Sequence, residues 1–554
     1  MSTTATAPRP VSTPHNSAEG TGMLTGAWTL VRFMLRRDRV RIPVWAVATG
    51  LGTMSSLGSL TETYGTIESR ASIVATMENP AMVAMTGVNP APDNYTFGAM
   101  MGHQLLVFTL VTVAIMSVLL MVRHTRAEEQ TGRAELVRAA VVGRHATSFA
   151  AYKTVATANL AVAAALTVLL ASQGVETIDW YGSLLYGAAH VVTGLVFASI
   201  ALVTVQISEY SRGAAGMGLA AIGVAYVVRG VGDVAGNGLS WLSPFGWAQA
   251  TRVYVDNRWW PLLIGLAFAL VVAVIGMALS TRRDVGAGLK APAASPATAS
   301  AALSNPFGFA LRLQRGMLIG WAVGLLFLGL SYGSVFADIE TFFEDFEGLD
   351  DLLPGAVGAD LTTAYMAMVM TVMAVMASSS AILAAQRLRS EESGGRAEPL
   401  LVAGLSRTRW VGSHVAVALV GGAIVMLAGG LGLGVAGAGS VGDWSILPDA
   451  LAASAMYVPA LWVVSAVGIA LFGMAPRLVP WVWAIVAYSF VAVYLRALIG
   501  LPEALKYLSP FGHVPQFPAV PFDAVPLLVL TGIAAALIAI GVVGFRRRDL
   551  ESTA

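Results

Sequence analysis

Long apolar runs dominate the chain and divide it into twelve stretches, each close to the length needed to cross a bilayer. A helix needs about 20 consecutive apolar residues to span the hydrocarbon core. The first six stretches lie near residues 42–60, 101–122, 153–172, 182–207, 214–233 and 261–280. The second six lie near residues 317–337, 365–386, 411–436, 448–473, 479–499 and 524–544. This pattern predicts an all-α polytopic membrane protein with twelve transmembrane helices.

Short motifs recur in the same order in the two sets of stretches, which indicates an internal repeat. The motif Glu-Glu-x-x-Gly-Arg-Ala-Glu occurs at residues 128–135 and 391–398. Leu-Ser-Pro-Phe-Gly occurs at residues 242–246 and 508–512, and Arg-Arg-Asp at residues 282–284 and 547–549. Because each half contains an even number of spans, the repeat is parallel, and we expect a pseudo-twofold axis along the membrane normal.

The repeat predicts two tandem six-helix halves, at residues 28–283 and 305–554. Residues 284–304 between them are rich in Ala, Pro and Ser, which is typical of a linker. Residues 1–27 are rich in Ser, Thr, Pro and Ala, and we expect them to form a disordered N-terminal segment. The first apolar run begins only near Ile42, so we do not expect a cleaved signal peptide.

Composition and charge support the membrane class and set an orientation. Hydrophobic residues make up 56% of the chain and charged residues 12%, whereas soluble domains carry about 25% charged residues. If the N-terminus is cytoplasmic, only six of the 33 Lys and Arg residues fall outside, and the positive-inside rule is then satisfied. The six are Arg70, Arg229, Arg252, Arg258, Arg496 and Lys506. We therefore predict a multi-pass protein with both termini in the cytoplasm. No basic block points to nucleic acid, and the absence of cysteine excludes disulfides and thiolate metal sites.

The polar loop after the second span of each half is the strongest local signal for function. Its Glu-before-Arg pairs at i, i+4, Glu129 with Arg133 and Glu392 with Arg396, favour a helix. We expect helices at residues 133–142 and 398–405. They are either coupling helices that dock on a cytoplasmic partner or solvated interfacial helices. Two equivalent surfaces would suit a dimeric partner. The candidate coupling residues are Glu128, Glu129, Gly132, Arg133 and Glu135 in the first half and Glu391, Glu392, Gly395, Arg396 and Glu398 in the second.

The residues before each half's first span have the pattern of a helix in the headgroup plane. In the first half, Leu24, Trp28 and Val31 fall at helical spacing while Arg32 and Arg36 lie on the other side. The second half repeats this more weakly around Leu311 and Arg312. The alternative is an ordinary cluster of positive charges on the inner side of the membrane.

Several features on the predicted outer side could form a gate. The two Leu-Ser-Pro-Phe-Gly stretches are apolar but too short to span, so each is either a re-entrant element or a loop anchored by aromatic residues. Arg229 and Arg496 sit near the outer ends of spans, where they either snorkel to the interface or belong to the gate. Asp233 lies four residues after Arg229 and could pair with it. The candidate gate residues are Arg229, Asp233, Arg496, Pro244, Phe245, Pro510 and Phe511. The outer loop at residues 338–360 is strongly acidic. It either favours the attraction or release of cations at the exit or is a solvated loop.

Methionines in the second span of each half are candidates for a substrate pathway. Met366, Met370 and Met373 share one helical face, and Met116 lies in the corresponding span of the first half. Flexible, polarizable methionine suits varied apolar ligands, and core filling is the alternative. His190 lies well inside a span, where packing is expected more often than proton relay.

The sequence contains no His-Glu-x-x-His, Gly-x-Ser-x-Gly or Gly-Lys-[Ser/Thr] motif. We therefore expect no catalytic site, no metal site and no ATP hydrolysis by this chain.

Six spans, a Glu-rich loop with Gly after the second span, and an outer element before the sixth resemble the ABC-2 type permeases. Two fused halves with Glu-Glu-x-x-Gly-Arg-Ala-Glu in both resemble the bacterial permeases that export polyketide antibiotics and related drugs. The resemblance covers residues 28–550. It implies a homodimeric ATPase subunit at the cytoplasmic face of the bacterial cytoplasmic membrane, with ATP and Mg²⁺ bound on that subunit and no cofactor in this chain. It implies export of small hydrophobic or amphiphilic compounds, with the second and fifth span of each half along the pathway. The family usually has Gly-Thr where this chain has Gly-Arg, so individual contacts do not carry over.

Two other classes of protein share some of these features. A proton-coupled transporter of the major facilitator type would share the span count and the parallel repeat. Such transporters usually carry buried charges for ion coupling, and this sequence has no carboxylate in mid-membrane. A membrane-embedded enzyme would need clustered carboxylates, histidines or metal ligands, which the sequence lacks.

Overall fold

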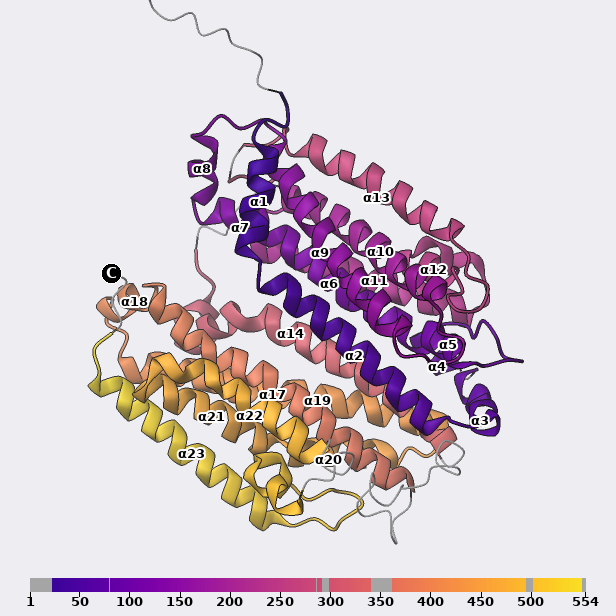
Figure 1. Ribbon diagram of the computed structural model, residues 1–554. Helices are drawn as coiled ribbons and strands as arrows, with labels where there is room; N and C mark the ends of the chain where they lie inside the picture. The colour runs from indigo at the N-terminus through magenta and orange to yellow at the C-terminus, as the bar shows by residue number, and fades with distance from the viewer. Residues whose placement is uncertain are drawn as a thin grey trace, which may run out of the picture. The chain divides into compact units, whose positions relative to one another are not determined.

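The computed structural model describes residues 22–78, 80–284, 286–290, 298–339, 361–494 and 502–550. All regular structure within these residues is helical (Figure 1). The chain divides into two compact units, Met1–Ala294 (unit 1) and Ser295–Ala554 (unit 2). The all-α prediction is confirmed for the described residues. The predicted boundaries of the N-terminal segment and of the linker stay predictions.

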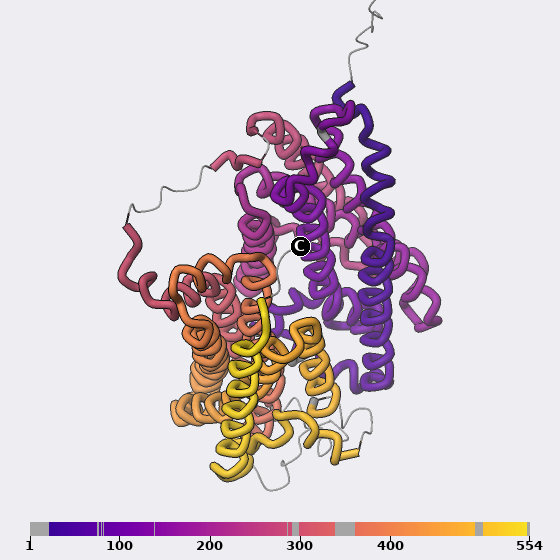
Figure 2. The backbone as a smooth tube through the Cα atoms, turned by 90° about the vertical axis from the view of Figure 1, so that its left-hand side faces the viewer, coloured from indigo at the N-terminus to yellow at the C-terminus, as the bar shows by residue number. Residues whose placement is uncertain are grey.

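Unit 1 begins with two helices that are separated by a short turn at residues 38–40. They are α1 (Ala27–Arg37) and α2 (Arg41–Thr63), and both pack against α9 (Ala146–Ala171). Figure 2 shows them in indigo along one edge of the unit. The remaining elements of unit 1 are α3 (Ile67–Met77), α4 (Pro80–Thr86), α5 (Phe97–Met100), η1 (Met101–Leu105), α6 (Leu106–His124), α7 (Arg126–Gln130), α8 (Arg133–Arg138), α10 (Trp180–Ile207), α11 (Ser211–Val234), η2 (Gly238–Leu242), α12 (Pro244–Gln249) and α13 (Trp260–Leu279).

The core of unit 1 is organised around α10. This helix packs against α6, α9, α11 and α13, and apolar side chains such as Leu185, Phe197 and Leu202 are fully buried on it. The arrangement brings the C-terminal ends of α6, α10 and α13 to the same end of the unit as the short helices α7 and α8. We call this the motif end of unit 1, because the motif at residues 128–135 lies there.

Unit 2 repeats the long helices with different interruptions. Its elements are η3 (Ala301–Ser304), α14 (Pro306–Gly333), η4 (Phe336–Asp338), α17 (Leu361–Ser393), α18 (Ala397–Val402), α19 (Arg407–Val441), α20 (Ile446–Met456), α21 (Val458–Met474), η5 (Pro476–Val482), α22 (Trp483–Ser489), η6 (Phe490–Tyr494), η7 (Glu503–Leu508), η8 (Pro510–His513) and α23 (Ala524–Arg547). The helices α14 and α19 lie together, as do α21 and α23. A Cβ on Gly329 of α14 would lie 2.3 Å from the carbonyl oxygen of Gly429 of α19. Small residues at such crossings let helix backbones approach closely in membranes.

Eleven helices in the described part of the chain are long and apolar enough to cross a membrane. They correspond to the second through the twelfth predicted stretches, and one of them, Pro476–Val493, ends beside residues outside the described set. The first predicted span coincides with α2, which has 23 residues but is interrupted by Ser, Thr and Gly and is not among the eleven. The first predicted span therefore stays a prediction, and with it the total of twelve.

The predicted short helices differ from the structure in their extent. Helix α8 ends at Arg138, not at residue 142, because the next residues turn back toward the N-terminal segment, where the Gly143 N–H donates to the carbonyl of Thr25. In unit 2, α18 ends at Val402. The predicted helix before the first span is a separate, amphipathic α1 in unit 1, with Val31 and Met34 buried and Trp28 and Phe33 exposed. In unit 2 the prediction of a separate helix before the span is wrong, since α14 is one continuous helix from Pro306 to Gly333. The acidic loop lies outside the described residues beyond Ile339.

Candidate functional site

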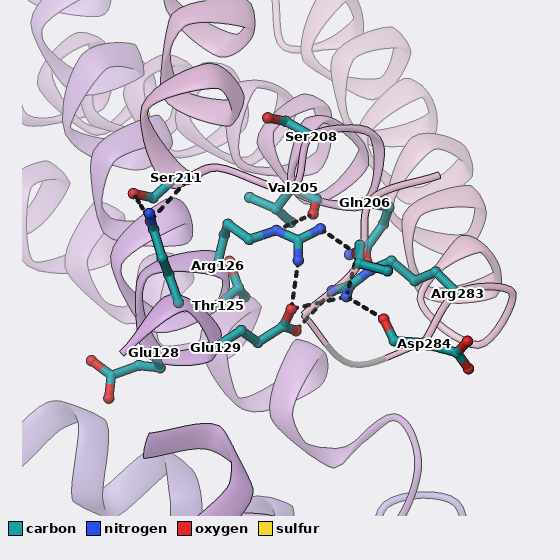
Figure 3. Close-up of polar contacts among 12 residues, drawn as sticks. Thr125, Arg126, Glu128, Glu129, Val205, Gln206, Ser208, Ser211, Arg283 and Asp284 are labelled. Atoms are coloured by element: carbon teal, nitrogen blue, oxygen red, sulfur yellow. Dashed lines mark hydrogen bonds and ion pairs between the residues drawn. The ribbon is translucent and has the colours of Figure 1, made fainter. Parts of the chain in front are cut away.

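The motif end of unit 1 is held together by one buried carboxylate. Glu129, on α7, accepts two hydrogen bonds from Arg283, with Nη2–Oε1 and Nη1–Oε2 distances of 2.7 and 2.8 Å (Figure 3). Arg126 donates to the same carboxylate at 2.8 Å. The side chains of Arg283 and Glu129 are 6% and 11% exposed, and that of Arg126 is fully buried. A bidentate guanidinium–carboxylate pair is among the stronger polar contacts in proteins.

The two arginines extend this contact to the ends of three spans. Arg126 donates to the carbonyls of Val205, at the end of α10, and Ala287, beyond α13, at 3.1 and 2.9 Å. Arg283 donates through Nε to the side-chain oxygen of Gln206 at 2.6 Å. Figure 3 shows Arg126 and Arg283 meeting at Glu129, with Gln206 of α10 beside Arg283. The ends of α6, α10 and α13 are therefore linked by charge-assisted hydrogen bonds.

Unit 2 contains the same ion pair. Arg548, which follows α23, donates to both oxygens of Glu392 at 2.7 and 2.6 Å, and the side chain of Glu392 is 2% exposed. The neighbouring Glu391 pairs with Arg387 at 2.6 Å and with Arg396 at 2.8 Å. Arg283 and Arg548 occupy the same position of the repeated Arg-Arg-Asp motif. In both units, therefore, the second Glu of the Glu-Glu-x-x-Gly-Arg-Ala-Glu motif forms an ion pair with the second Arg of the Arg-Arg-Asp motif.

The predicted pairing of Glu129 with Arg133 and of Glu392 with Arg396 is wrong. Gly132 has a φ of 73°, a left-handed conformation that ends α7 before α8 begins, so Glu129 and Arg133 lie on different helices. Arg133 lies nearest Glu128, at 4.0 Å. Gly395 has a φ of 67° at the same motif position. The glycines therefore set the turn, and the acidic residues before it point into the protein.

Burial divides the candidate coupling residues into two groups. Glu129, Glu391 and Glu392 are largely enclosed, whereas Arg133 and Glu135 on α8, Arg396 just before α18, and Glu398 on α18 are exposed. Ala134 and Ala397, between the exposed residues, are buried and anchor these short helices. The surface that a partner could contact is therefore α8 and α18, and the carboxylates before each glycine are internal supports. No observation tests a docking role for either group.

The turn between α1 and α2 is tied to the same end of the unit. Glu128 pairs with Arg37 of α1 at 2.5 Å. The buried carboxylate of Asp38 accepts hydrogen bonds from His124 Nε2 at 2.5 Å and Arg123 Nε at 3.2 Å. Burial alone would raise the pKa of Asp38, but His124 and the adjacent arginines hold that pKa below its ordinary value of 3.8. Sequence reasoning missed Asp38 and the arginine partners, although Arg283 and Arg548 stood in a repeated motif.

At the opposite end of unit 1, Arg229 is buried rather than directed to a membrane interface, so snorkelling is wrong for this residue. It pairs with Asp233 at 3.4 Å and donates to the carbonyls of Ala84 and Met85, at the end of α4, at 2.7 and 3.0 Å. The predicted pairing with Asp233 is confirmed. The buried guanidinium fixes α4 against α11.

The Leu-Ser-Pro-Phe-Gly stretches form short capped helices at the ends of their units. Ser243 caps α12, where Pro244 and Phe245 are buried. Ser509 caps η8 in the same way, with Phe511 buried and Pro510 partly exposed. Both phenylalanines pack into their units, as an anchored or re-entrant element requires. Arg496 lies outside the described residues, and the gate role of the whole group stays a prediction.

The candidate pathway methionines are packed in the cores. Met366, Met370 and Met373 lie in the core of unit 2 and Met116 in that of unit 1, each at most 1% exposed. Their pathway role stays a prediction. His190 makes hydrogen bonds to the carbonyl of Tyr186 and the hydroxyl of Thr109 at 2.8 and 2.9 Å, as expected of a packed histidine. Among the described residues, no group of three or more His, Asp or Glu side chains could hold a metal ion.

Comparison with known proteins gives the family. A family model described as the C-terminal domain of the multidrug efflux system permease Rv1217c matches residues 29–279 and 303–546, one segment in each compact unit. The multidrug efflux system permease protein Rv1217c of Mycobacterium tuberculosis is 39% identical over 546 residues, which cover 97% of both chains. With eleven helices suited to crossing a bilayer, the chain is a multi-pass membrane protein. It belongs to the family of the multidrug efflux permease Rv1217c.

Proposed function

We propose that this chain is the membrane-spanning permease of an ATP-binding cassette exporter of the ABC-2 type. A separate homodimeric ATPase subunit binds ATP and Mg²⁺ at the cytoplasmic face and supplies the energy. The permease moves small hydrophobic or amphiphilic compounds, drug-like or resembling polyketide antibiotics, out of the cell. Support comes from the name of the relative, a multidrug efflux permease, and from the resemblance of the repeated loops to ABC-2 permeases.

The observation that carries this proposal is the repeated buried ion pair at the motif ends. A force generated by a soluble motor reaches membrane helices only through a stiff connection. Glu129–Arg283 and Glu392–Arg548 join the end of the second span to the end of the last span in each unit. The exposed helices α8 and α18 follow directly. Each unit thus offers a short docking helix on a rigid base, and two such surfaces suit a twofold-symmetric ATPase.

Charge distribution supports one orientation of the proposed complex. The motif ends carry most of the arginines, and the positive-inside rule places such segments in the cytoplasm. Both termini are then cytoplasmic, and α4, α12 and η8 lie on the outer side. In a bacterial cell the chain would reside in the cytoplasmic membrane.

The test is to purify the permease alone and together with a candidate ATPase, in liposomes. We expect no hydrolysis by the permease alone, because the sequence lacks a phosphate-binding loop. The complex should hydrolyse ATP, and a drug that is transported should stimulate it. Turnover by the verified single chain, or efflux that continues without any ATPase, would overturn the assignment.

A further inference from the structure

The motif end of unit 1 contains a cavity of ≈ 410 Å³. Its walls come from α1, the segment from α6 to α8, the start of α9 and the ends of α10 and α13. Drug-sized ligands and headgroups occupy cavities of about 300–1,000 Å³. The residues that matter for its chemistry are Phe33, Arg37, Arg133, Leu136, Arg144 and Arg283.

The cavity carries more positive than negative charge. Of its four arginines, Arg283 is paired with Glu129, and Arg37 with Glu128. Arg133 lies 4.0 Å from the already paired Glu128, and its side chain is 61% exposed. Arg144 is exposed and donates a hydrogen bond to the sulfur of Met23 at 3.5 Å; it has none of the ion pairs found among the described residues. Two guanidinium groups are therefore available to an anion.

One rim of the cavity is apolar. Phe33 and Leu136 line it and are 58% and 77% exposed, and Trp28, on α1, is 65% exposed. The cavity lies where the long helices α6, α10 and α13 end, which is the depth of the lipid headgroups when these helices cross a bilayer. An amphipathic helix with arginines and exposed aromatic residues is suited to that depth.

The corresponding region of unit 2 is filled. At the spacing that matches Glu128 with Glu391, Thr147 of the cavity wall matches Trp410 and Arg144 matches Arg407. At the spacing that matches Arg283 with Arg548, Ser280 of the wall matches Phe545. The rings of Trp410 and Phe545 lie 5.4 Å apart, and Phe472 lies 5.2 Å from Phe545.

Arg407, the arginine of unit 2 that matches Arg144, is also engaged in hydrogen bonds. Arg407 donates to the carbonyl of Arg548 at 2.6 Å and to that of Phe545 at 3.2 Å, so it caps the end of α23. In unit 1 small residues leave the space open and leave Arg144 available. The cavity is therefore a property of the first half of the sequence and not of the shared fold.

We propose that this cavity binds an acidic phospholipid, with the phosphate on Arg133 and Arg144 and the acyl chains along Phe33 and Leu136. Two arginines and an apolar rim complement a molecule that is anionic at one end and aliphatic at the other. This lipid belongs to the inner leaflet if the motif end is cytoplasmic, and that assignment rests on the proposed function. The chemistry of the cavity does not depend on it.

The experiment measures lipid retention by the permease alone. The purified protein in nanodiscs is exchanged against phosphatidylglycerol or phosphatidylcholine, and bound lipid is counted by native mass spectrometry. We expect wild type to prefer phosphatidylglycerol by about 30-fold, which corresponds to roughly 1 kcal/mol for each of the two arginines at the lipid surface. The double variant Arg133→Gln with Arg144→Gln should lose this preference. The matched control Arg212→Gln, at an exposed arginine outside the cavity, should keep it.

A second variant tests the space rather than the charge. Thr147→Trp with Ser280→Phe places the residues of unit 2 in unit 1, and it should exclude the lipid while Arg133 and Arg144 remain. The proposal is overturned if wild type retains both lipids equally, or if both variants keep the preference. It is also overturned if the arginine variant keeps its lipid but loses the ATPase on co-purification, since the cavity would then belong to the protein partner. Failure to find any ATPase would not affect the lipid measurement, so the two proposals fail separately.

Discussion

The motif ends of the two units contain the same buried ion pair in different surroundings. In unit 1, Glu129 and Arg283 border an open, arginine-lined cavity, and a turn centred on the buried Asp38 separates α1 from α2. In unit 2, Arg548 stacks over the rings of Phe472 and Phe545, and α14 runs without interruption. At the spacing that matches Phe33 with Phe309 and Trp45 with Trp321, Asp38 corresponds to Gln314. Gln314 is buried and contacts His414. The comparison teaches that the ion pair is the structural requirement shared by both halves, whereas its surroundings can diverge.

The largest effect should come from breaking the shared pair. Glu129→Lys places a third cation beside the buried Arg126 and Arg283, and Glu392→Lys places a cation against Arg548. Breaking a buried pair costs about 3–5 kcal/mol because a charge is left unpaired. We expect loss of the monodisperse protein in detergent for both variants, measured by size-exclusion chromatography and thermal melting.

The control for this prediction exchanges the partners. Glu129→Arg with Arg283→Glu restores opposite charges and should recover part of the lost stability. If the single variants melt at the same temperature as wild type, the pair is not a structural support, and the proposed rigid connection fails.

The next effect separates docking from folding. Glu135→Lys on α8 and Glu398→Lys on α18 change exposed charges, so expression and melting should stay near wild type. If these helices dock on the ATPase, co-purification should weaken and substrate-stimulated hydrolysis should be lost, since an unpaired charge in an interface costs about 2–5 kcal/mol. Lys290→Glu, in the predicted linker, is the control and should do little. Full coupling in both variants would move the docking surface elsewhere, most directly to α1 around Arg32 and Arg36.

A smaller effect should distinguish the turn between α1 and α2 in unit 1 from the unbroken helix α14 in unit 2. Asp38→Gln installs the residue of unit 2 and leaves His124 without its carboxylate, at a cost of about 1–3 kcal/mol. The pKa of Asp38 is lowered in the folded protein, so its ionised form stabilises the fold above its ordinary pKa of 3.8. That stabilisation is lost as pH falls through the lowered pKa of the folded state. Melting curves measured from pH 4 down to pH 2 should fall more steeply for wild type than for the variant. Identical pH profiles would mean that another group carries the dependence.

The last prediction is that loss of the proton gradient has no effect on drug efflux. Collapse of the proton gradient at constant ATP should leave drug efflux intact, because energy is proposed to enter through ATP. Efflux that stops under these conditions would favour the proton-coupled major facilitator alternative. The buried histidines His103, His190 and His414 would then need testing by substitution with Gln.

The sequence by itself determined the helical class, the positions of the long apolar helices and the repeated motifs. These depend on local properties, namely hydrophobic run length and short identical segments, and eleven of the predicted stretches agree with the structure. The sequence also placed Asp233 beside Arg229, because i and i+4 are neighbours on one helix.

Only the tertiary structure decided which charges pair and which are exposed. Glu129 is four residues from Arg133 in sequence, yet it binds Arg283, because Gly132 turns the chain and α13 returns to the end of α6. For Arg229 the sequence left snorkelling and a gate role open, and the structure shows it buried, where it donates to carbonyls at the end of α4. The cavity in unit 1 and the aromatic cluster in unit 2 depend on side chains from several helices meeting at one place. The periodicity of the sequence does not predict these contacts, because they depend on how several helices pack together and not on the pattern within one helix.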